Sequence, residues 1–249
     1  MTDRDPADPE SVTRRPDVVG LLEGLATTRA IRRYTDEPVP SEALSEMLFA
    51  ATRAPSGSNR QPFRFLVLTD GPDARAAKRL IGAGARGIWS AKREHDGYGR
   101  GSGTRDDAPK ARLARTMQRY VDEFERAPVL VLACLVRYRD PNPLEGASIY
   151  PACQNLLLAA RALGYGGVLT GLHFTVETEL RALLGIPDGV FVAASITIGR
   201  PEGGHGPVRR RPISELVFAD RWGEAAPWAV DPPGTRHTAG GPPGPSTAS

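Results

Sequence analysis

Two groups of arginines stand where they could bind a phosphate. Arg29, Arg32 and Arg33 lie within five residues, directly after a short apolar run. The second group, residues 209–211, precedes Pro212. A guanidinium matches phosphate oxygens with paired hydrogen bonds, so two such groups in one domain can converge on one anion. Charged runs are also common on solvated surfaces, and each group alone is compatible with a solvated basic face.

A tight polar loop follows the first arginines. Residues 54–63 read Ala-Pro-Ser-Gly-Ser-Asn-Arg-Gln-Pro-Phe and lead into an apolar stretch. The amide of Asn59 offers both a donor and an acceptor to a polar ligand edge. A plain turn would need only Gly57 and the prolines, and this simpler interpretation stays open for the loop alone.

A glycine-rich stretch, residues 162–172, is the third candidate. Gly164, Gly166 and Gly167 would let backbone approach a ligand closely. Glycines at these positions are also ordinary helix stops and turn residues. The stretch by itself therefore favours neither interpretation.

Together the three segments resemble the flavin-binding signature of the FMN-dependent nitroreductase family. Residues 55–62 match the family pattern Pro-Ser-x-x-Asn-x-Gln-Pro in full, and the resemblance extends from about Val18 to Gly223. It implies a nitroreductase-like α+β fold, with a central mixed sheet covered by helices on both faces. It also implies a homodimer in which a C-terminal extension packs on the partner.

The resemblance assigns a role to each matched residue. The implied cofactor-binding residues are Arg29, Ala30, Arg32, Pro55, Ser56, Ser58, Asn59, Val168, Leu169, Thr170, Gly171, Arg209, Arg210 and Arg211. The first two are expected at the FMN phosphate and ribityl chain, and Arg32 at the flavin N1 and O2 edge, where positive charge favours the reduced flavin. Residues 55–59 face the polar flavin edge, residues 168–171 direct a backbone N–H at N5, and residues 209–211 complete the phosphate site. Arg33 is expected to stay solvated.

The chain departs from the family at two of these positions. Many relatives have a basic residue where Thr28 stands and a serine where Ala30 stands. We therefore expect fewer phosphate contacts from this segment and a larger share from residues 209–211.

The function implied by the resemblance is that of an FMN-dependent oxidoreductase. It would transfer a hydride from NAD(P)H through bound FMN to a nitroaromatic, a quinone or a related small-molecule acceptor, without a catalytic side chain, because the chemistry occurs at N5. Two alternatives stay open. One is other flavin chemistry of the same superfamily, namely reductive dehalogenation, ene reduction or flavin fragmentation. The other is a protein that sequesters flavin without catalysis.

Composition and sequence motifs argue against several other classes of protein. The 249 residues are 40% hydrophobic with a net charge of +3, which suits a globular domain, and no basic stripe interleaved with aromatics suggests nucleic acid. No apolar run suggests a membrane span or a signal peptide, so we expect a cytoplasmic protein.

Cys134 and Cys153 are expected to be buried free thiols and His173 a structural histidine, with no metal site. Walker, Rossmann and nucleophile-elbow motifs are absent from the sequence.

The remaining pattern predicts one domain, residues 17–228, between flexible tails at 1–16 and 229–249. Apolar periodicity predicts helices over residues 18–25, 41–54, 72–81, 109–124, 148–163 and 176–184, the second of them ended by Pro55. Continuous apolar runs predict strands over 63–69, 129–136, 166–170 and 190–198. Residues 82–108 contain seven glycines and are expected to form a long connection, either a lid or a disordered loop.

Overall fold

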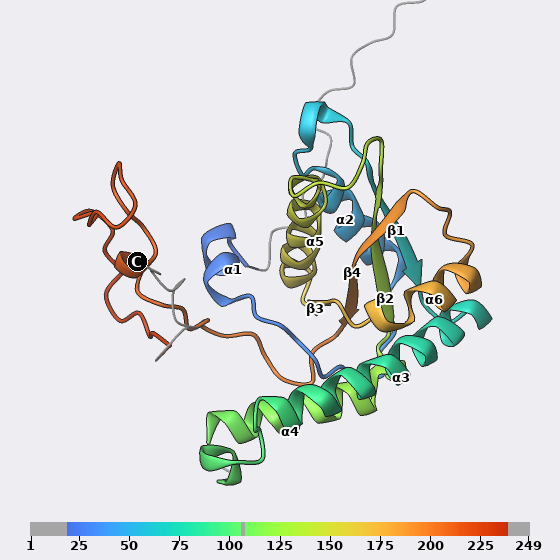
Figure 1. Ribbon diagram of the computed structural model, residues 1–249, viewed down its shortest axis with the longest axis horizontal. Helices are drawn as coiled ribbons and strands as arrows, with labels where there is room; N and C mark the ends of the chain where they lie inside the picture. Colours follow the sequence, from blue (N-terminus) through green and yellow to red (C-terminus); the bar gives the residue numbers. More distant parts are fainter. Residues whose placement is uncertain (1–18, 106–107, 239–249) are drawn as a thin grey trace, which may run out of the picture.

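The computed structural model describes residues 19–105 and 108–238 (Figure 1). The predicted N-terminal tail, residues 1–16, and the end of the predicted C-terminal tail lie outside these described residues. The helices are α1 (Leu21–Thr27), α2 (Ser41–Thr52), α3 (Pro72–His95), α4 (Pro109–Asp122), α5 (Tyr150–Ala162) and α6 (Glu177–Leu184). Short 3-10 turns occur at Gly57–Asn59, Gly101–Thr104, Phe124–Arg126, Glu145–Ser148, Phe174–Val176 and Ile213–Glu215.

Four strands form the central sheet. They are β1 (Phe63–Leu68), β2 (Val129–Val136), β3 (Gly166–Thr170) and β4 (Val190–Gly199), in the order β1-β2-β4-β3. All three pairings between these strands are antiparallel, which corrects the predicted mixed sheet. β2 and β3 do run in the same direction, but β4 lies between them, so no two parallel strands are neighbours. The predicted α+β class is confirmed.

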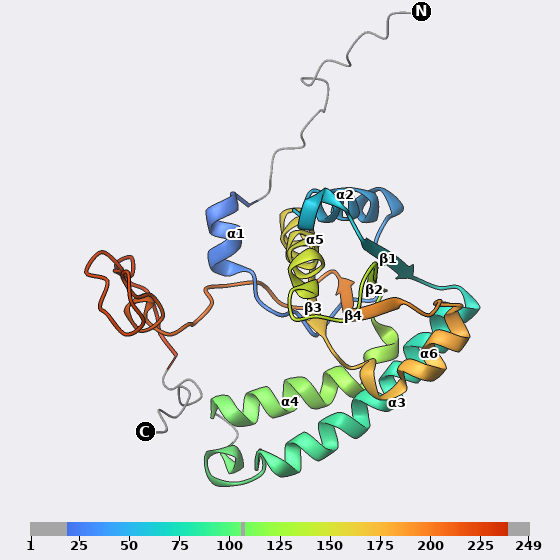
Figure 2. The same ribbon diagram turned by 45° about the horizontal axis from the view of Figure 1, so that its top comes forward.

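Helices cover both faces of the sheet, as predicted (Figures 1 and 2). Along β2, Val129, Val131 and Ala133 join the core formed with α2 and α5, while Leu130 and Leu132 join the core formed with α3, α4 and α6. Successive strand residues point to opposite faces, so a strand buried on both sides needs an unbroken apolar run. That requirement explains why β2 has the predicted bounds. β3 also has its predicted bounds, and β1 and β4 each differ from the predicted range by one residue.

The predicted lid is wrong in its first half, because α3 continues through residues 82–95. Two of the glycines that suggested a loop, Gly82 and Gly84, are instead packing positions on the helix. A Cβ added at Gly82 would lie 2.5 Å from Glu125 Oε1, and one added at Gly84 would lie 2.8 Å from Thr175 Oγ1. The helix therefore tolerates the low propensity of glycine in exchange for close contact with its neighbours. The link to α4 comprises residues 96–108 and includes the 3-10 turn Gly101–Thr104; Pro109 occupies the first turn of α4.

Both cysteines are buried and unpaired, which confirms the prediction of free thiols. Burial raises the pKa of Cys134 to about 11 and that of Cys153 to about 12, so both stay protonated at neutral pH. Within residues 19–105 and 108–238, no helix combines the length and apolar character needed to cross a membrane. The same part of the chain contains no cluster of three potential metal ligands.

After β4 the chain first runs along α1 and then leaves the body. The N–H of Gly206 donates to Thr27 O at 3.2 Å and that of Val208 to Ala26 O at 3.1 Å. Residues 212–236, which we name the C-terminal arm, stand apart from the sheet and its helices in both views (Figures 1 and 2). Large apolar side chains of the arm are exposed, including Trp222 at 87% and Trp228 at 71%. This amount of exposed apolar surface is typical of a segment that binds another surface.

Candidate cofactor site

The first arginine segment is anchored to the glycine-rich strand. The N–H of Ile31 donates to Gly167 O at 3.0 Å, and the Ile31 side chain is buried against Gly166, where an added Cβ would lie 2.5 Å from Ile31 Cγ1. Glycine at 166 is thus required by this close approach. The first and third motifs of the sequence are brought together in this way, at the edge formed by β3.

A polar hollow of about 260 Å³ opens beside this contact. Its lining is Arg29, Ala30, Ile31, Arg32, Arg33, Thr116, Pro201, Gly203 and Gly204. Arg29 Nη2 donates to Gly204 O at 2.9 Å, and Arg32 Nε is buried without a partner. Among the described residues, no carboxylate forms an ion pair with the three arginines of the lining. Unpaired guanidinium groups around one hollow favour an anionic ligand. Arg33 belongs to this lining, although we expected it to be only solvated.

Buried hydroxyl groups adjoin Arg32. The Tyr34 hydroxyl donates to Ile31 O at 2.6 Å, and Thr197 Oγ1 lies 2.9 Å from the hydroxyls of both Tyr34 and Tyr120. Burial raises the pKa of Tyr120 to about 12, against the opposing influence of Thr197, Arg32 and Thr170. Burial also raises the pKa of Tyr34 well above its usual range. Both phenols are therefore neutral, and their hydrogen bonds to Thr197 tie them to β4.

Sequence reasoning missed Tyr120 and Thr116 as neighbours of the site. Tyr120 is one of several residues in the apolar stripe of α4, and its position suggested only a core role. The available signal was its hydroxyl, because a buried tyrosine needs a hydrogen-bond partner.

The end of β3 presents backbone and one polar side chain to this region. Val168 is buried in the core, so it can meet a ligand only through its backbone, whereas Leu169 is 38% exposed. Thr170 Oγ1 lies 2.9 Å from Ser195 Oγ on β4. A Cβ added at Gly171 would lie 2.5 Å from Phe174 Cε2, so a side chain there would have to displace this half-exposed ring.

The polar loop at residues 55–61 lies elsewhere. It leads into Phe63, which pairs with Leu135, and Leu135 pairs in turn with Phe191 at the start of β4. The Arg29 segment lies near Gly199, at the other end of β4 (Figure 1). Within one chain, the structure therefore separates the loop from the arginine-lined hollow by the length of the sheet.

The loop nevertheless has a defined and strained shape. Ser58, Asn59 and Gln61 have φ of 51°, 50° and 49°, values that non-glycine residues seldom adopt. Ser56 Oγ accepts a hydrogen bond from the N–H of Gln61 at 2.9 Å, and Gln61 Nε2 donates to Asn59 Oδ1 at 3.2 Å. Pro55, Ser58 and Asn59 are exposed. Strain of this kind is often found at functional sites.

The second arginine group lies near the first along the backbone. Val208 is hydrogen-bonded to Ala26, so Arg209 follows α1 closely, and both Arg209 and Arg210 are exposed. Arg211 is engaged with Glu215 through an Nε–Oε2 contact of 2.8 Å. The structure thus brings this group to the side of α1 near Arg29, with one of its three members already paired.

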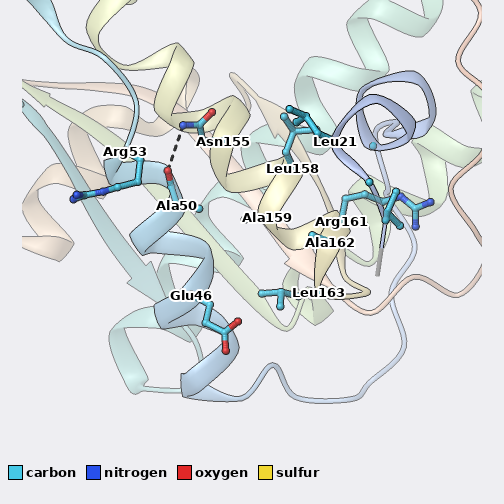
Figure 3. Close-up of a pocket in the computed structure, with 13 residues that line it drawn as sticks. Leu21, Glu46, Ala50, Arg53, Asn155, Leu158, Ala159, Arg161, Ala162 and Leu163 are labelled. Carbon is cyan, nitrogen blue, oxygen red and sulfur yellow. Dashed lines mark hydrogen bonds between the residues drawn. The ribbon is translucent and has the colours of Figure 1, made fainter. Parts of the chain in front are cut away.

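A second, apolar hollow of about 430 Å³ lies between α1, α2 and α5 (Figure 3). Leu21, Leu158 and Leu163 line it, and Asn155 Nδ2 donates to Ala50 O at 3.3 Å across one side. Leu21 and Leu22 on α1 are 69% and 80% exposed. This face is apolar and uncovered within one chain.

His173 is structural, as predicted. Its side chain is fully buried, and Nε2–H donates to Val192 O at 2.9 Å. Burial lowers its pKa, with smaller effects from its surroundings, so the ring is neutral in the folded protein.

The free energy of unfolding is therefore expected to depend on His173 at acid pH. The unfolded chain binds a proton near pH 6.5 and the folded chain only at lower pH, so this contribution is complete above pH 6.5 and is lost as the pH falls. His173→Gln should flatten the acid limb of urea-unfolding stability by up to about 1.4 kcal/mol per pH unit. His95→Gln, at an exposed position on α3, is the control. Equal pH profiles for His173→Gln and wild type would contradict this assignment.

A four-stranded sheet with helices on both faces is a fold that occurs in known proteins. The model of the nitroreductase family matches residues 25–200, and the chain belongs to this family. A chloronitrobenzene nitroreductase of Comamonas testosteroni is 30% identical, over 69% of this chain and 82% of its own. An NADH dehydrogenase of Thermus thermophilus is 29% identical, over 76% of this chain and 91% of its own. A nitroreductase structure in complex with FMN, from Desulfovibrio desulfuricans, superposes with a TM-score of 0.59 at 30% identity, over 84% of this chain and 99% of that one.

Proposed function

We propose that this chain is an FMN-dependent oxidoreductase that takes its hydride from NAD(P)H. The observation that carries the proposal is the arginine-lined hollow joined to the glycine-rich end of β3, whose guanidinium groups have no carboxylate partner in the described residues. Family membership and the relatives named for NAD(P)H and FMN chemistry support it. Bound FMN would supply the redox chemistry by accepting a hydride at N5 and passing it on.

The residues present fit this cofactor. Arg29 would hold the phosphate and Ala30 would leave room for the ribityl chain, because its side chain adds little bulk. Arg32 has a buried, unpartnered Nε in the hollow, so it suits the electron-rich pyrimidine edge of a flavin. Thr170 ends the strand and Gly171 follows it, and the lack of a side chain at Gly171 would let backbone there approach N5. None of these groups needs to act as a nucleophile or base.

A homodimer would complete the site. The loop containing Pro55, Ser56, Ser58 and Asn59 is at the far end of the sheet from Arg29, so it can meet the same flavin only from a second copy of the chain. The exposed C-terminal arm and the apolar hollow beside α5 offer matching surfaces for that second copy. Arg209 and Arg210 would add charge near the phosphate.

For the electron acceptor we propose nitroaromatic compounds, quinones or related small molecules. Relatives named for nitroaromatic substrates, including chloronitrobenzene and 4-nitrobenzoate reductases, support this range. An anaerobic steady-state comparison of NADH and NADPH against nitroaromatics, quinones, enones and halophenols would distinguish these acceptors from the other flavin chemistry of the superfamily.

The purified protein is expected to be yellow and to release FMN, and no FAD, on denaturation. The reason is that the arginine-lined hollow suits one terminal phosphate and the fold has no dinucleotide-binding unit. Chromatography of the released flavin identifies it, and anaerobic bleaching by NAD(P)H separates an enzyme from a flavin store. Recovery of a colourless protein that does not bind added FMN would refute the proposal.

A further inference from the structure

Three chain segments meet at one corner beside Arg29. Arg161, in the last turn of α5, donates from Nη2 to Thr27 Oγ1 at 3.5 Å. His205 donates from Nε2 to Tyr165 O at 3.1 Å, and the N–H of Gly206 donates to Thr27 O. We name this place the phosphate corner and define it by Thr28, Arg161 and His205.

Each residue of the phosphate corner has a buried polar atom without a partner. These atoms are Thr28 Oγ1, Arg161 Nε and His205 Nδ1. They account for three of the five such side-chain atoms found in the described part of the chain. An unsatisfied buried polar group is costly, and native proteins seldom gather several at one place without a ligand or water to meet them.

The corner is also positively charged. Burial lowers the pKa of His205, the hydrogen bond to Tyr165 opposes this shift, and the positive charges of Arg161 and Arg29 add to it. Arg29 bonds to Gly204, the residue next to His205. No carboxylate among the described residues pairs with Arg161 or Arg29.

A purely structural role for Arg161 explains less. An arginine in the last turn of a helix often stabilises the C-terminal carbonyls, but Arg161 directs its hydrogen bond to Thr27 instead. That single bond leaves Nε unused, and its length of 3.5 Å makes it weak.

We infer that Arg161, together with Arg29 and the hydroxyl of Thr28, binds the phosphomonoester of FMN. The inference rests on the proposed function and deepens it. It moves part of the phosphate site from the exposed residues 209–211 to the end of α5, where buried donors are already in place. NADPH also carries a phosphomonoester, at its 2′ position, and the test separates these two sources.

The test compares two flavins that differ only in the phosphate. Apoprotein is titrated with FMN and with riboflavin, and binding is followed by quenching of flavin fluorescence. Arg161→Gln should weaken FMN binding roughly tenfold to a hundredfold, as expected for a lost charge-assisted hydrogen bond, and leave riboflavin binding unchanged. Arg53→Gln is the matched control, since Arg53 lines the same apolar hollow as Arg161 but bonds to Thr52 Oγ1 at 2.9 Å (Figure 3).

A second variant tests position directly. Thr28→Arg, introduced into Arg161→Gln, should restore much of the FMN affinity, because it returns a guanidinium to the same corner from the adjoining segment. Equal losses for FMN and riboflavin in Arg161→Gln would indicate a structural role and overturn the inference. So would unchanged FMN binding combined with a loss of preference for NADPH over NADH. Failure of the wild-type apoprotein to bind either flavin would instead overturn the proposed function.

Discussion

Deletion of residues 213–249 is expected to convert a stable dimer into a monomer. Leu216, Trp222 and Trp228 are 55%, 87% and 71% exposed in the single chain, and the face beside α5 that could receive them is equally uncovered. Burial of a large apolar side chain contributes about 1.5–3 kcal/mol, so loss of three raises the dissociation constant by roughly a thousandfold or more. Sedimentation equilibrium or light scattering over a range of concentrations measures this change.

The matched control is deletion of residues 239–249 alone. It keeps Asp231, whose carboxylate accepts a hydrogen bond from the N–H of Ile213 at 3.1 Å. It also keeps His237, whose backbone forms an isolated β-bridge with that of Arg210. The shortened chain should remain dimeric and retain flavin. A full-length protein that is monomeric and loaded with flavin would contradict the dimer and the shared site together.

Arg29→Ala and Arg32→Ala should have different effects on the flavin. Arg29→Ala removes a charge-assisted phosphate contact and should weaken FMN binding by about 1.5–3 kcal/mol, roughly tenfold to a hundredfold, while the potential of flavin that stays bound changes little. Arg32→Ala should lower the reduction potential, because the reduced, negatively charged flavin loses its neighbouring cation. Fluorescence titration gives the affinities, and equilibration with reference dyes gives the potentials.

Arg126→Ala serves as the control for both variants. Arg126 is an exposed arginine whose Nη2 pairs with Asp36 Oδ1 at 2.8 Å, and a surface pair of this kind contributes little. Equal potentials for Arg32→Ala and wild type would show that Arg32 is not at the N1 edge. Full FMN retention by Arg29→Ala would remove that residue from the phosphate site.

Much of the fold could be predicted because apolar runs report burial directly. The strands buried on both faces, such as residues 129–136, stand out as unbroken runs. The extension of α3 could not be predicted. Gly82 and Gly84 contact side chains of distant segments, and sequence alone does not reveal which contacts a glycine allows. The strand order could not be predicted either, because β4, the last strand in the sequence, lies between β2 and β3 in the sheet.

The sequence motifs predicted which residues belong to the candidate site but only partly where they lie. The Arg29–Tyr34 segment and the start of β3 meet in one place, joined by the hydrogen bond from Ile31 to Gly167. The loop at residues 55–59 lies elsewhere, because a motif does not specify where the fold places its residues. Arg161, which we propose as a phosphate ligand, gave no signal in the sequence, since it lies in a helix whose pattern indicates only burial.

Tyr34 and Tyr120 share Thr197 Oγ1 next to Arg32, and burial keeps both phenols protonated far above neutral pH. Neither of these two phenols beside Arg32 therefore changes its charge over the pH range in which a flavin enzyme works. A redox cofactor held there would follow a Nernstian pH slope governed by its own proton uptake. Because Arg32 would favour the anionic over the neutral reduced flavin, it would lower the pH at which that slope changes, and Arg32→Ala should raise it.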